Sequence, residues 1–133
     1  MEKFLLDTNI CIFLLKEKYA VKQKIDKIGY ANCYISEITL AELAYGAEYS
    51  LDPDKNLLQV NNFRKKVTII PISNAIALYA KEKAQLRRKG MLIDDMDIFI
   101  GATAVANNMV LVTENEKHLN RLSNIKIENW IKR

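Results

Sequence analysis

Short apolar segments alternate with longer helical segments along the chain, and this alternation constrains the fold more than any other sequence feature. The first four apolar segments are each four residues long and mostly apolar. Strands that are apolar on both faces indicate a parallel sheet with helices packed on both sides. The sequence therefore predicts an α/β fold, a three-layer sandwich in which helices flank a short central parallel sheet of four to five strands.

Polar residues and glycines predict where these elements begin and end. Thr8 or Asn9, Ser36 and Ser73 can cap the first, third and fifth helices, and Gly90 can end the fifth. We expect strands over 3–6, 33–36, 67–70, 109–112 and 125–128, and helices over 9–16, 19–29, 37–49, 53–65, 74–89, 95–107 and 115–121.

Length and composition limit the class of protein. The 133 residues fit a single domain, 1–133, and no apolar run reaches the roughly 18 residues that a membrane-spanning helix requires. No signal peptide is visible, and we expect Cys11 and Cys33 to be reduced, buried thiols of a cytoplasmic protein. The net charge of +4 and the pI near 9 permit an anionic partner without requiring one.

Asp7 directly follows the first predicted strand, where a carboxylate is costly unless something compensates its charge. Ligands of parallel α/β sheets bind beyond the carboxyl ends of the strands. Asp7 therefore either caps the following helix or belongs to a site. The polar residues after the fourth strand, 113–116, present the same alternatives, because Thr113 or Asn115 can cap the helix at 115–121.

Glu42 is an acidic residue on a predicted apolar helix face. It lies four residues after Ile38 and three before Tyr45, on a stripe that also includes Tyr49. A charge in the middle of such a stripe should be rare, because charged side chains are seldom buried. Glu42 is therefore either a site residue or a residue at the edge of the stripe that reaches water.

The helix at 95–107 is apolar almost all round, yet aspartates crowd its start. Asp94 can cap this helix, and Asp95 can interact favourably with the helix dipole. Asp97 is explained less well, because it shares a face with Gly101, whose small size indicates that another backbone segment approaches closely. Asp97 is therefore either a site residue or a partly exposed acid of the first helical turn.

Together these residues predict one acidic site. Two strand ends and two helix faces would bring Asp7, Glu42, Asp97 and the polar residues after the fourth strand to one edge of the sheet, where like charges repel. Mg²⁺ or Mn²⁺ would relieve the repulsion with oxygen ligands alone, which suits a chain with one histidine. Such a site beside a basic surface is typical of enzymes that hydrolyse phosphodiesters.

Three stretches give the chain a family resemblance: "LLDTNICIFLL", "SEITLAELAYGAEYS", and "MLIDDMDIFIGATAVANNMVLVTEN" followed by "IKIENW". In order, spacing and length the chain resembles a PIN-domain ribonuclease, and within that group a VapC-type toxin of a toxin–antitoxin pair. The resemblance implies an acidic triad of Asp7, Glu42 and Asp97, with Asp7 and Asp97 as metal ligands. Asn115 falls at a fourth catalytic position, and we place Asn9, Asp95, Thr113 and Glu116 around the site as supporting residues.

Two positions depart from the family pattern. Asn115 is neutral where many relatives carry Asp, and His118 stands where relatives often have Glu or Asp. Glu114 or Glu116 could substitute for the missing charge, and His118 is either catalytic or a surface residue of a short helix. We therefore expect one firmly held Mg²⁺ and leave a second metal open.

The resemblance also implies partners: an RNA substrate, a small antitoxin protein that covers the acidic site, and a second copy of the chain in a homodimer. Basic residues at 64–66 and 81–89 either steer the RNA backbone or form solvated helix faces. Tyr45, Tyr49 and Phe63 are either interface or core residues.

Two other classes of protein fit the sequence less well. A phospho-receiver domain is also a parallel α/β chain, but it needs an Asp after a central strand and a Lys after a later one. Here the third and fourth strands lead into Pro71 and Thr113, which argues against that class. A catalytically silent PIN fold that acts only as a binding module is opposed by the intact triad, although the neutral Asn115 keeps it open.

Overall fold

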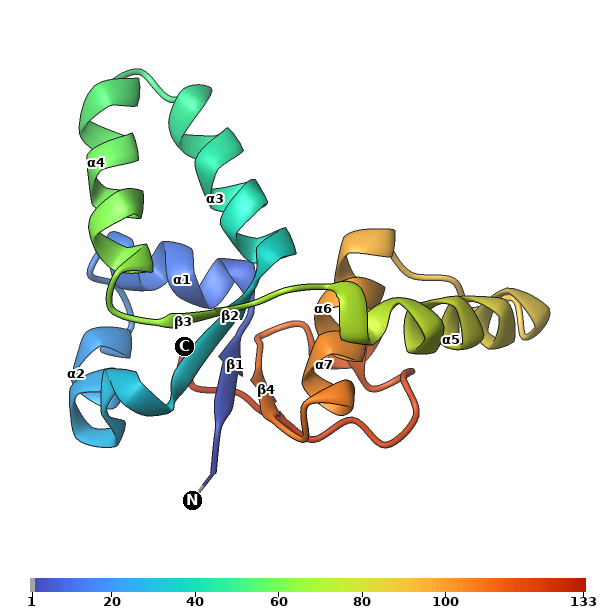
Figure 1. The fold of residues 1–133 in the computed structure, drawn as a ribbon. Helices are drawn as coiled ribbons and strands as arrows, with labels where there is room; N and C mark the ends of the chain where they lie inside the picture. Colours follow the sequence, from blue (N-terminus) through green and yellow to red (C-terminus); the bar gives the residue numbers. More distant parts are fainter. Residues whose placement is uncertain (1) are drawn as a thin grey trace.

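A computed structural model describes residues 2–133 and contains a five-stranded parallel sheet in the order β3-β2-β1-β4-β5, with helices on both faces (Figure 1). The predicted three-layer α/β sandwich is confirmed. The strands are β1 (Phe4–Leu6), β2 (Cys33–Ser36), β3 (Thr68–Ile70), β4 (Val110–Val112) and β5 (Ile127–Glu128). The helices are α1 (Thr8–Leu15), α2 (Val21–Ile28), α3 (Glu37–Glu48), α4 (Pro53–Arg64), α5 (Ile76–Arg88), α6 (Asp95–Ala106) and α7 (Glu116–Leu119).

The central strands are apolar throughout because each contributes to two cores. Phe4 and Leu6 pack with residues of α1, α2 and α4, whereas Leu5, between them, packs with Ile98 of α6 on the opposite face. Leu5, Leu6 and Ile98 are all completely buried. Alternate strand residues thus point to opposite faces of the sheet, and both faces exclude water.

Some element ends differ from those predicted. Asp7, rather than Thr8 or Asn9, caps α1, because its carboxylate accepts a hydrogen bond from the Thr8 N–H. Ser73 does not cap the fifth helix through its side chain. A 3₁₀ turn over Ser73–Ala75 leads into α5 instead, and its Ala75 N–H donates to the Ile72 carbonyl. Asp94 takes the predicted N-cap position of α6, also without a side-chain capping bond.

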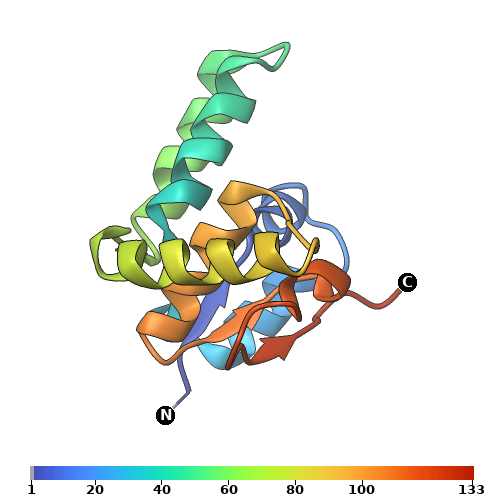
Figure 2. The ribbon, with the colours of Figure 1, turned by 90° about the vertical axis from the view of Figure 1, so that its right-hand side faces the viewer.

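Helices α3 and α4 form an antiparallel hairpin that projects from the body of the protein (Figures 1 and 2). The apolar stripe predicted for α3 is wrong. Its buried residues are Thr39, Leu43 and Ala47, whereas Tyr45 and Tyr49 are 68% and 81% exposed. Periodicity favoured the large tyrosines, but α3 packs against α4 through the face that carries Leu43 and Ala47.

The prediction that another backbone segment approaches Gly101 closely is wrong, because the atoms nearest to this residue belong to side chains. A Cβ atom at this position would overlap the side chain of Leu122 and lie 3.2 Å from Cδ1 of Leu119. Gly101 therefore lets α7 and the segment after it pack onto α6. The expected buried, free thiols of Cys11 and Cys33 are confirmed. Within 2–133, none of the helices combines the length and apolarity needed to cross a membrane.

Candidate active site

The acidic residues gather where the connectivity of the sheet reverses. From β1 the chain builds β2 and β3 on one side of the sheet, and it later adds β4 and β5 on the other. The last residues of β1 and β4, Leu6 and Val112, are paired in register. Asp7 and Thr113 therefore leave neighbouring strand ends, which is the position where open α/β sheets bind their ligands.

Asp7 is held in one orientation by two hydrogen bonds. Its Oδ1 accepts from the Thr8 N–H at 2.8 Å, and its Oδ2 accepts from the Thr113 hydroxyl at 2.7 Å. The residue is only 6% exposed, and burial raises the pKa of Asp7, opposed by these two bonds. Asp7 therefore caps α1 and also presents a buried carboxylate at the strand end, and its place in a functional site stays a prediction.

Glu42 reaches the same region from α3. The Thr8 hydroxyl donates to Oε1 of Glu42 at 2.6 Å and lies 3.1 Å from the Thr39 hydroxyl. Glu42 is partly buried beside the true core stripe of α3, so its carboxylate faces α1 without being sealed from water. In the sequence Thr8 stands out only as a possible cap, because no local pattern shows that its hydroxyl meets a residue 34 positions away.

Asp97 completes the acidic cluster from the first turn of α6. Partial burial, followed by the negative charges of Asp7, Asp94 and Glu42, raises the pKa of Asp97 to about 6. The side-chain amide of Asn115 lies 3.4 Å from Oδ2 of Asp97, a long contact that brings the fourth predicted position to the same cluster. The structure thus brings together Asp7, Glu42, Asp97 and Asn115.

The predicted supporting residues differ in where they lie. Thr113 is buried and directly bonded to Asp7. Asp95 faces α5, where it accepts from the Tyr79 hydroxyl and pairs with Lys83 at 2.8 Å. The side chains of Asn9 and Glu116 are exposed.

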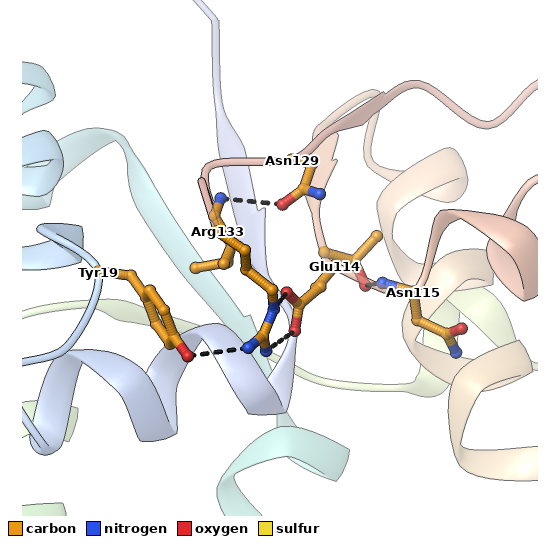
Figure 3. A network of polar contacts seen from close by, with 7 residues as sticks. Tyr19, Glu114, Asn115, Asn129 and Arg133 are labelled. Atoms are coloured by element: carbon orange, nitrogen blue, oxygen red, sulfur yellow. Dashed lines mark hydrogen bonds and ion pairs between the residues drawn. The ribbon is translucent and has the colours of Figure 1, made fainter.

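Glu114 belongs to a different network and does not supply the charge that Asn115 lacks. Its carboxylate binds the Arg133 guanidinium through both oxygens, at 2.7 and 3.0 Å, and this bond lowers the pKa of Glu114 (Figure 3). Arg133 also donates to the Tyr19 hydroxyl at 2.9 Å. His118 is exposed on α7. The sequence held no signal for the Glu114–Arg133 pair, because its members are far apart in the chain.

The donor chemistry of the cluster fits a hard divalent cation. Within 2–133, no group of three or more His, Cys, Asp or Glu side chains is arranged as a cage that could hold a metal ion. Mg²⁺ requires no such cage, since it is commonly bound by one or two carboxylates and keeps several water ligands. Asp7 and Asp97 are the two carboxylates that suit this role, because a cation between them would offset the repulsion that, after burial, raises the pKa of Asp97.

In the absence of divalent cations, the raised pKa of Asp97 predicts how the unfolding free energy changes with pH. Between the ordinary value of 3.8 and about 6 the folded chain binds more protons at Asp97 than the unfolded chain. Unfolding free energy should therefore fall as pH rises through this window, by about 1–2 kcal/mol, because partial exposure reduces the full effect. Urea unfolding in EDTA from pH 4 to 7 measures this change in unfolding free energy. The unfolding free energy of Asp97→Asn should fall less steeply over the same range. An equal decline in both proteins would contradict this assignment.

Comparison with known proteins gives this fold and site a family. The family model described as "PIN domain" matches residues 4–125. The tRNA(fMet)-specific endonuclease VapC of Salmonella typhimurium is 37% identical over 131 residues, covering 98% of this chain and 99% of the relative. Ribonuclease VapC2 of Haemophilus influenzae is 34% identical over 133 residues, covering 98% of this chain and all of the relative.

A solved structure agrees with these relatives. The DNA-bound VapBC complex from Salmonella typhimurium contains a chain that superposes with a TM-score of 0.91 at 36% identity, covering 98% of this chain and 99% of that one. The chain therefore belongs to the PIN-domain family, and within it to the VapC-type ribonuclease toxins.

Proposed function

We propose that this chain is a Mg²⁺-dependent endoribonuclease, the toxin of a toxin–antitoxin pair, and that residues 1–133 form its single nuclease domain. The observation that carries the proposal is the convergence of Asp7, Glu42 and Asp97 at the carboxyl ends of β1 and β4, where burial and then the acidic neighbours raise the pKa of Asp97. An all-oxygen acidic cluster suits a divalent cation and a phosphodiester substrate. Because the Salmonella relative is named a tRNA(fMet)-specific endonuclease, tRNA(fMet) is the first substrate to test.

In this proposal each residue of the cluster has a distinct task. Asp7 and Asp97 would hold the cation, with Asp7 oriented by Thr113. When bound, the cation neutralises phosphate charge and lowers the pKa of a water molecule. Glu42, oriented by the Thr8 hydroxyl, accepts a proton from the attacking water or positions that water. The attack is in line with the leaving oxygen and needs no 2′-hydroxyl.

The proposed partners follow from the family and the site. A small antitoxin covers the acidic cluster. The guanidinium of an antitoxin arginine would pair bidentately with one of the carboxylates of the cluster. Two copies of the chain form a homodimer, and the exposed Tyr45 and Tyr49 on α3 are consistent with contact to another protein chain. Because its substrate is RNA, we place its action in the cytoplasm.

Mapping new RNA ends in cells that express the chain without its antitoxin tests the proposed function. We expect one or a few discrete cleavage sites, with tRNA(fMet) examined first, and none in cells expressing Asp97→Asn at the same level. A protein encoded beside this gene should bind the toxin and suppress both cleavage and growth arrest. Absence of induced ends, together with normal growth, would contradict the proposal.

A further inference from the structure

A second surface, separate from the acidic cluster, lies between α2 and the chain that follows β5. It is a cleft of about 650 Å³ whose lining includes Tyr19, Lys24, Lys27, Glu128, Trp130 and Lys132. We call it the lysine cleft. None of these residues takes part in the metal and water chemistry proposed above, and neither basic run noted in the sequence contributes to it.

The lysine cleft carries a net positive charge, because its lining holds three lysines and one glutamate. Lys24, Lys27 and Lys132 are all exposed, and within 2–133 the ion pairs are Lys22–Asp26, Lys83–Asp95 and Arg133–Glu114. The acidic side chain in the lining, Glu128, accepts a hydrogen bond from the Trp130 indole at 2.9 Å. Three free ammonium groups around one cleft favour an anion with several charges along its length.

Aromatic groups line the same cleft. Lys24 Nζ lies 5.9 Å from the centre of the Trp130 ring, which is itself packed against Phe4 and only 9% exposed. Tyr19 is 37% exposed, but its ring packs edge-on with Phe13 at 4.8 Å and the Arg133 guanidinium lies 5.0 Å from its centre. The aromatic rings therefore form the wall of the cleft, and its lysines are the groups that can bind a nucleic-acid backbone with little sequence preference.

The lysine cleft is connected to the acidic cluster. Glu128 ends β5, and its carbonyl accepts a hydrogen bond from the Thr113 N–H at 3.0 Å. Between the cleft and Asn115, Arg133 joins Tyr19 to Glu114, so polar groups run from Tyr19 to the residue beside Asn115 (Figure 3). A polyanion lying across the acidic cluster can therefore continue past Arg133 into the cleft.

We infer that the lysine cleft binds the sugar–phosphate backbone of the RNA substrate on one side of the cleaved bond. This inference rests on the proposed function, because it takes RNA as the substrate. Phosphate contacts in the cleft hold the strand and add affinity without reading sequence. The cleft therefore favours substrates with a single-stranded extension over minimal ones that reach only the acidic cluster.

The test compares two triple variants that lose the same charge. The cleft variant is Lys24→Gln/Lys27→Gln/Lys132→Gln, and the control is Lys3→Gln/Lys55→Gln/Lys126→Gln, at exposed lysines away from the cleft. Both are made in the Asp7→Asn background, so that RNA is bound without being cut. For each variant, the affinity for single-stranded RNA is measured with strands of about 12 and about 4 nucleotides. These two lengths bracket a typical single-strand site.

For the long RNA, the cleft variant should lose about 10-fold in affinity, and the slope of log K against log salt should fall by about 2 for three lost phosphate contacts. The control should change affinity less than about twofold, and the short RNA should show a smaller difference between the variants. Melting temperatures equal to that of the parent exclude misfolding as the cause.

Each result has one meaning. Equal losses in the two triple variants overturn the inference and leave the proposed function intact. No binding of either RNA by the parent, together with no cleavage by wild type, removes the proposed function itself. Unchanged RNA binding by the cleft variant, with weakened binding of the antitoxin, assigns the cleft to an acidic protein segment instead and also overturns the inference.

Discussion

Replacing Asp7 with Asn is expected to reduce RNA cleavage by about 10³-fold or more while leaving the fold intact. The substitution removes one negative charge and a strong oxygen ligand from a cluster proposed to hold Mg²⁺, and several kcal/mol of transition-state stabilisation depend on that cation. Asn still has an oxygen that can accept from the Thr8 N–H, so the cap of α1 should survive. Cleavage of labelled RNA under single-turnover conditions measures the loss.

Stability gives an independent measure for the same variant. Burial raises the pKa of Asp7, so the charged form is disfavoured in the folded protein, and neutral Asn relieves that cost. In EDTA the variant should therefore melt no lower than wild type. Asp7→Ala, which lacks the capping oxygen, should lose about 1 kcal/mol by comparison.

Asp26→Asn is the matched control, since Asp26 is an exposed partner of Lys22 on α2. It should cleave RNA like wild type. Retained cleavage by Asp7→Asn would show that Asp7 is only a helix cap.

Removal of divalent cations should abolish cleavage by the wild-type chain, and Mg²⁺ or Mn²⁺ should restore it. The physical reason is the all-oxygen composition of the cluster, which leaves the acidic side chains repelling one another and a bound phosphate unless a cation intervenes. Ca²⁺ should support RNA binding but little turnover. Cleavage in excess EDTA, followed by titration of each metal, measures the effect.

The same cation should stabilise the folded chain by mass action. At about 100 times its dissociation constant, Mg²⁺ adds about 2.7 kcal/mol to the unfolding free energy. The wild type should therefore melt several degrees higher in Mg²⁺ than in EDTA, and Asp7→Asn and Asp97→Asn should gain less. Full activity in EDTA, from protein shown to lack contaminating nuclease, would exclude metal-assisted hydrolysis.

The sequence by itself determined the layers of the fold, because the apolar strands permit burial on both faces only between two layers of helices. Leu5 and Leu111 on one face, with Leu6 and Val112 on the other, show this directly. It also indicated Asp7 and Asp97 as candidate site residues, because a carboxylate at the end of a buried strand or on an apolar helix is costly and needs a compensating reason.

The tertiary structure alone decided which distant side chains meet. Periodicity placed Glu42 on a stripe with Tyr45 and Tyr49, yet packing against α4 buried the face of Leu43 and Ala47 and left those tyrosines in solvent. The Thr8–Glu42 hydrogen bond followed from that choice of face.

The pairing of Glu114 with Arg133 and the assembly of the lysine cleft likewise join residues separated by up to about 110 positions. Local sequence patterns report which face of an element is apolar, whereas contacts between elements depend on strand order and helix packing. Only the folded chain fixes strand order and helix packing, because both depend on the free energy of the whole core.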